Sequence, residues 1–259
     1  MYAYVQIALR ILRPVGFALF CSGLVACGGV PDPLDPVVNP TPSACSAPEG
    51  LMITDMQSVV DWINAMPKPL TLPCFTQSLP RPLKVYTSLG TVSAQPAIDS
   101  KRPRFFIFIN NMTLSVVPGE SYPTHVDGSP QDPDSTKYNQ LELSQPTTGY
   151  LSIKGELRFP VRDTLPNAAP YKDLEYAFGY SICGLCHHYE KKIGSLDGIS
   201  IFVSDRKMPR DAQNLAVARE EHKLCDRTAD PYHCDMMAAI FDKGEVVWQD
   251  FPALLRGHF

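Results

Sequence analysis

The residues of this sequence best suited to chemistry are Cys183, Cys186 and His187, within the run Cys-Gly-Leu-Cys-His. Two thiols at this spacing can close a small disulfide, exchange with other thiols, or bind a metal ion together with a nearby imidazole. Charged residues follow at once, namely Glu190 and Lys191. Because burying such a run beside an apolar group is costly, we expect a loop at the solvent edge, closed by its own disulfide.

The same five residues resemble the haem attachment motif of c-type cytochromes. In that family the two thiols bond to the haem vinyl groups, and the adjacent histidine ligates the iron. The resemblance therefore implies haem attachment at Cys183 and Cys186, with His187 as an axial ligand. Met208, which precedes a proline further along the chain, is the first candidate for the other axial position.

The amino terminus has the features of an export signal followed by a membrane anchor. Arg10 and Arg13 precede an apolar stretch of about a dozen residues, which is too short to span a bilayer. Leu-Val-Ala then precedes Cys27, and this run resembles the lipobox of bacterial lipoproteins. The resemblance implies that residues 1–26 are a signal peptide and that Cys27 is acylated and becomes the mature amino terminus. Gly28 after the cysteine implies the outer membrane of a Gram-negative host.

Residues 27–50 are expected to form a proline-rich tether, because their six prolines favour an extended spacer. Removal of residues 1–26 takes away two arginines and no acid, so the formal charge of −4 becomes −6. An acidic chain without a basic block argues against nucleic-acid binding. The expected partner is membrane lipid, through the acyl groups on Cys27, and no protein partner is indicated.

The cysteine count also favours export. Of eight cysteines, Cys21 leaves with the signal peptide and Cys27 is lipidated, which leaves an even number. Even numbers in exported chains are typical of disulfides. The local spacing favours two pairs, Cys225–Cys234 and Cys45–Cys74.

We expect residues 51–259 to form a single globular extracytoplasmic domain. Thr54 to Gln57 match a capping box that begins a helix, and two further helices are expected over 211–224 and 234–242, joined as a hairpin. Between the first helix and this hairpin lie alternating or β-branched runs, which predict strands at 83–89, 104–109, 112–117, 140–144, 150–161 and 198–203. The expected class is mainly β, an antiparallel sandwich-like core with flanking helices and a C-terminal helical hairpin (α+β).

No set of residues in the sequence assembles a catalytic centre or a metal site. We therefore expect a membrane-anchored lipoprotein of the cell envelope that acts as a non-catalytic binding or scaffold module, with no firm cofactor. The alternative is an anchored mono-haem c-type protein that transfers electrons or binds haem through the Cys-x-x-Cys-His motif.

Overall fold

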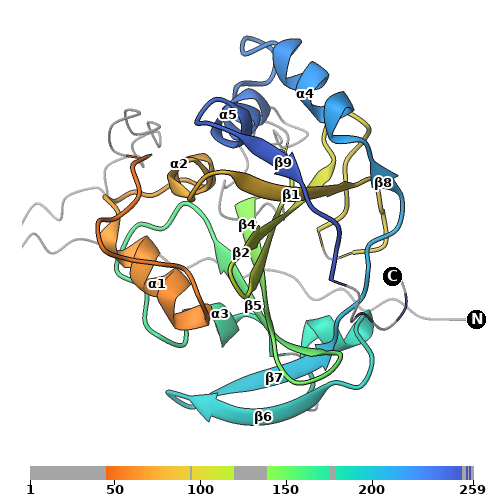
Figure 1. Ribbon diagram of the computed structural model, residues 1–259. Coiled ribbons are helices and arrows are strands. Elements are labelled where there is room, and N and C mark those ends of the chain that lie inside the picture. Colours follow the sequence, from red (N-terminus) through yellow and green to blue (C-terminus); the bar gives the residue numbers. More distant parts are fainter. Residues whose placement is uncertain are drawn as a thin grey trace, which may run out of the picture. The chain divides into compact units, whose positions relative to one another are not determined.

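The computed structural model describes residues 45–93, 95–119, 139–175, 179–252, 255 and 257. The expected signal peptide, the expected lipidation site Cys27 and most of the expected tether lie outside these residues. Within the described part, nine strands form one open sheet, and five α-helices accompany it (Figure 1). The mainly β, α+β class with flanking helices is confirmed, and the sandwich-like core is one sheet layered with helices.

The sheet has the strand order β6-β7-β5-β4-β3-β2-β1-β8, and β9 also pairs with β1. Every strand pair is antiparallel except β1 with β9, which is parallel. The predicted strands form the centre of this sheet, whereas the short β8 and β9 and the polar β6 escaped prediction. The strand bounds are β1 Leu83–Ser88, β2 Arg104–Ile109, β3 Met112–Val116, β4 Gln140–Pro146, β5 Leu151–Arg158, β6 Lys191–Leu196, β7 Ile199–Asp205, β8 Ala212–Gln213 and β9 Val246–Trp248.

The main core lies on one face of the sheet. Alternate positions of β2, such as Phe105 and Ile107, are fully buried there because side chains along a strand point to opposite faces. The five helices contribute to the same apolar cluster, through residues such as Val59, Phe75 and Met236. These helices are α1 (Met56–Ala65), α2 (Leu72–Ser78), α3 (Ala169–Lys172), α4 (Leu215–Lys223) and α5 (Pro231–Phe241).

The other face of the sheet is partly covered by the chain that follows β9. Phe251 lies edge-on to Tyr86, Phe106 and Phe108, with ring centroids 5.0, 5.1 and 5.1 Å away. These aromatic residues form a second buried cluster, separate from the main core. The covering segment is attached to the sheet where the Gln249 amide donates to the carbonyl of Val85 at 2.9 Å.

The predicted helices are present, but their starts differ from the prediction. The helix predicted over 211–224 begins at Leu215, and the helix predicted over 234–242 begins at Pro231. The first helix begins one residue later than predicted, because Asp55 rather than Thr54 is its N-cap. The Asp55 carboxylate accepts from the Ser58 amide at 2.8 Å, and the Ser58 hydroxyl accepts from the Asp55 amide at 2.9 Å. This reciprocal pair satisfies two amides that the helix itself leaves without partners.

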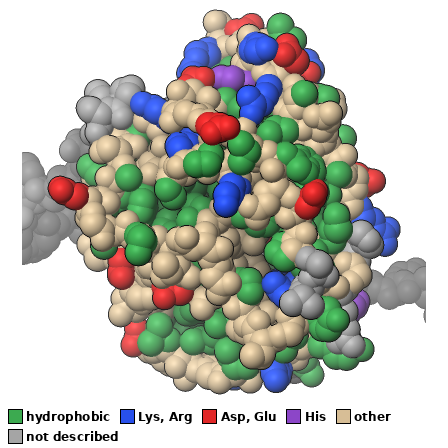
Figure 2. Space-filling model, viewed as in Figure 1, with side chains coloured by type: hydrophobic (Ala, Val, Ile, Leu, Met, Phe, Trp, Pro, Cys, Tyr) green, Lys and Arg blue, Asp and Glu red, His purple; other side chains and the backbone are tan. Residues whose placement is uncertain are grey.

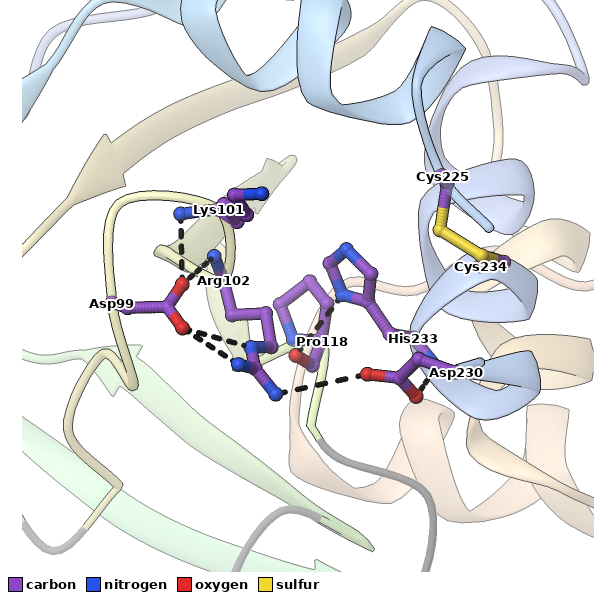
Figure 3. Close-up of polar contacts among 8 residues, drawn as sticks. All are labelled: Asp99, Lys101, Arg102, Pro118, Cys225, Asp230, His233 and Cys234. Carbon is purple, nitrogen blue, oxygen red and sulfur yellow. Dashed lines mark hydrogen bonds and ion pairs between the residues drawn. A yellow bond between two sulfur atoms is a disulfide. The ribbon is translucent and has the colours of Figure 1, made fainter. Parts of the chain in front are cut away.

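The C-terminal helices form the expected hairpin, and disulfides join Cys225 to Cys234 and Cys45 to Cys74. Figure 3 shows the start of α5, where Arg102 lies between two carboxylates. Its guanidinium is 2.7 Å from Asp99 and 3.6 Å from Asp230, the N-cap of α5. These contacts fix α5 against the loop before β2, so this charged cluster has a structural role.

The surface carries charges of both signs. Figure 2 shows that basic and acidic side chains are interspersed on the face seen in Figure 1, and that both kinds gather over α4. Nowhere in the described ranges does a helix combine the length and the apolar character needed to cross a bilayer.

Candidate functional site

A polar patch lies on the sheet face opposite the main core. Strand register places its side chains in two neighbouring rows, because Cα partners in adjacent strands share a face. One row contains Phe106, Ser115, Glu142 and Glu156, and the next contains Phe108, Thr113, Ser144 and Lys154. Polar side chains on an open sheet face normally contact solvent. Here these two rows form the floor of a cavity.

The Cys-x-x-Cys-His segment lies over this floor. The four residues that follow Ser181, Ile182–Leu185, form a 3₁₀ helix. The Ser181 hydroxyl accepts from the Cys183 amide at 3.1 Å. Glu190 in turn accepts from the Ser181 amide at 2.6 Å. A Cβ on Gly184 would meet the Glu190 carboxylate at 2.8 Å, so glycine lets the segment fold back closely on itself.

The cavity between the floor and this segment has a volume of about 120 Å³. The acidic and basic side chains that line it belong to β2, β4, β5 and the loop after β7. They are Arg104, Glu142, Lys154, Glu156, Arg206 and Lys207. Its apolar walls include Phe106, Leu174, Ile182, Phe251 and Leu255. The site therefore combines an apolar wall with buried charge, which is typical of small-molecule sites.

His187 lines the cavity with its ring orientation fixed. A carbonyl can only accept, so His187 Nδ1–H donates to the carbonyl of Asp205 at 2.6 Å, and Nε2 is the basic nitrogen of the neutral ring. Burial and the charge of Lys154 hold the pKa of His187 well below 6.5. The imidazole is therefore neutral at pH 7.

The two cysteines of the motif are separate thiols in the structure, which differs from the disulfide expected for this loop. Burial raises the pKa of Cys183 to about 12. Because the thiolate is the nucleophile and the metal ligand, a thiol that stays protonated at neutral pH is poorly suited to either role. Among the described residues, no group of three or more His, Cys, Asp or Glu side chains is placed to share a metal ion.

Lys154 is the most unusual group of the floor. The residue is 7% exposed, and burial lowers its pKa from 10.5 to about 8. The charges of Arg206 and Arg104 act in the same direction, while Cys183 and Glu142 oppose them. Within the described part of the chain its amine makes no hydrogen bond and no ion pair. A buried amine without a partner is costly, and such groups are typical of functional sites.

The carboxylates of the floor are only partly satisfied. Glu142 Oε2 accepts from the Arg104 guanidinium, but Glu142 Oε1 is buried and has no hydrogen-bond partner. Glu156 faces Glu142 across the strand pair. Burial, with the charge of Glu142 next, raises the pKa of Glu156 to about 7. The floor thus holds an unused acceptor close to an unused donor.

The structure brings some of the predicted site residues together and separates others. Cys183, Cys186 and His187 line the cavity, whereas Met208 packs against the aromatic cluster of Tyr86, Phe106 and Phe108. Sequence reasoning missed Lys154 and Glu142. Both lie at alternate polar positions of predicted strands, a pattern that also fits a face exposed to solvent.

Comparison with known proteins gives no relative for this chain. No family model matches it, and neither a curated protein nor a solved structure is significantly similar.

Proposed function

We propose that this chain is a lipid-anchored protein of the bacterial cell envelope whose folded part binds a small molecule in the cavity beneath the Cys-x-x-Cys-His segment. The observation that carries the binding role is Lys154, a buried lysine at the floor of that cavity whose amine makes no hydrogen bond or ion pair among the described residues. A lysine kept there at the expense of stability is explained if a ligand supplies its partner.

Two observations support the envelope location. Leu-Val-Ala before Cys27 supplies the lipidation signal. The disulfides Cys45–Cys74 and Cys225–Cys234 suit an oxidising compartment, because such bonds are rare in reducing cytoplasm. The protein thus holds its cavity at a membrane surface, where it collects or presents a small ligand.

Binding is tested with fluorobenzene, a neutral apolar probe small enough for a cavity of about 120 Å³, whose ¹⁹F resonance shifts when it is bound. We expect saturable binding with one site per chain. Thr113→Trp fills the cavity and should weaken binding of the probe by about 10-fold or more, whereas Thr228→Trp, an exposed position between α4 and α5, should not. Equal affinities in the two variants, or no saturable binding by the native protein, would contradict the proposal.

Covalent haem is the second candidate, and the orientation of His187 favours it. A histidine whose Nδ1–H is held by a backbone carbonyl presents Nε2 as a ligand, as metal-binding histidines do. The charged floor does not fit an apolar porphyrin face, since Lys154 and Glu142 lie beneath the thiols. The small-molecule role is therefore our first proposal.

A further inference from the structure

The lining of the cavity has a charge opposite to that of the whole chain. Four basic residues line it, Arg104, Lys154, Arg206 and Lys207, against the two acidic residues Glu142 and Glu156. The chain as a whole has a formal charge of −4. A local excess of positive charge in a partly closed space attracts anions and disfavours cations.

The polar atoms without partners define what the ligand must offer. Lys154 makes no hydrogen bond or ion pair within the described residues, and the buried Arg206 Nε lacks a hydrogen-bond partner there too. Both are donors. Arg104 is already engaged, because it donates to Glu142 and to Ser115. An anionic acceptor on the ligand would therefore bind at Lys154, with Arg206 as the second donor.

Glu142 Oε1 requires the opposite kind of group, a donor. Glu142 pairs with Glu156, and Lys154 lies two residues before Glu156 on the same strand face. The unused acceptor and the unused amine are thus diagonal neighbours across β4 and β5, close enough for one small molecule to contact both. A ligand ammonium would suffer repulsion from the surrounding basic groups, so a hydroxyl fits better.

We propose that the cavity binds a small hydroxy acid, with its carboxylate on Lys154, its hydroxyl donating to Glu142 and its apolar part against Phe106 and Phe251. This assignment rests on the proposed binding function and names its ligand class. No covalent step is involved. Burial lowers the pKa of Lys154 to about 8. A bound carboxylate would counteract this shift, because its negative charge favours the protonated amine.

The test is displacement of fluorobenzene by three matched competitors, 2-hydroxybutyrate, butyrate and butanol. We expect butyrate to displace the probe at a concentration about 10-fold lower than butanol, and 2-hydroxybutyrate at one about 10-fold lower again, since hydrogen bonds to charged groups contribute at about this level. Lys154→Met and the polar Lys154→Gln should abolish the preference for the acids while they still bind fluorobenzene. Lys84→Met, at an exposed position of β1, should behave as the native protein.

Four outcomes would overturn the hydroxy-acid assignment. If fluorobenzene binds but all three competitors displace it equally, the cavity binds apolar molecules only. If the preference for acids survives both changes at Lys154, the carboxylate lies elsewhere. If the hydroxyl adds nothing, Glu142 has no part in recognition. If fluorobenzene itself fails to bind, the binding function fails as well, and this neutral probe distinguishes that result from the others.

Discussion

Replacing Lys154 with Met should stabilise the protein at neutral pH. Folding takes the protonated amine out of water and lowers its pKa from 10.5 to about 8. At 1.36 kcal/mol for each pKa unit, this difference corresponds to about 3 kcal/mol of lost stability at pH 7. The side chain is 7% exposed, so solvent screening reduces this figure little. A methionine of similar length removes the charge and keeps the packing.

The pH dependence has a definite sign. Between pH 8 and pH 10.5 the unfolded chain binds more protons at Lys154 than the folded chain, so the stability of the native protein rises with pH in that window. The advantage of Lys154→Met should therefore fall to roughly half its pH 7 value by pH 9.5, because the folded amine is then mostly neutral while the unfolded amine is still mostly protonated.

Urea unfolding of the native protein and the variant at both pH values measures this difference. At pH 7 the midpoint of the variant should lie about 1 M higher. Lys84→Met serves as the control, because Lys84 belongs to the same row of side chains across the sheet but is exposed. A gap between Lys154→Met and the native protein that stays constant with pH would refute the reasoning, as would destabilisation at both pH values.

Three further predictions concern the cysteines. Cys27→Ser should release the protein from the membrane fraction, and retention there at unchanged mass would contradict the lipobox. Replacing Cys225 and Cys234 together by Ala should cost about 2.5 kcal/mol in urea unfolding, from the entropy of a loop of about ten residues, and peptide mapping without reduction should recover one cross-linked fragment from the native protein. Protein made with cytochrome c maturation machinery should lack a haem adduct and a Soret band, and an adduct that disappears in Cys186→Ala would promote the haem alternative.

The elements that were predictable are those whose local pattern agrees with their tertiary environment. β2 and β3 alternate or are β-branched, and the C-terminal hairpin is marked by two cysteines at short spacing. β9 was not predictable, because three residues carry no periodicity and their pairing with β1 depends on chain far away in sequence. α2 begins with a proline in its first turn, which resembles a helix stop in the sequence.

The candidate site was half predictable. Cys183, Cys186 and His187 were recognisable by spacing, because their chemistry depends on near neighbours. Lys154 and Glu142 were not recognisable, since a polar residue at an alternate strand position reads as solvent-facing. Only the fold places a cover over that face, and burial then changes the properties of both groups. The thiols show the same limit: their protonation state follows from burial, which spacing does not reveal.

The outer edge of β1 is sealed by two short strands from the carboxy-terminal part of the chain. β9 pairs with Leu83–Val85, and β8 pairs with Thr87 and Ser88. Until β8 and β9 have been synthesised, β1 presents an unpaired edge of six residues. This edge lies beside the aromatic cluster that Phe251 later covers. Such an edge is a template for pairing with another copy of the chain. A protein cut short before Val246 would therefore tend to aggregate rather than fold as a smaller domain, and β9 together with Phe251 protects the sheet against self-association.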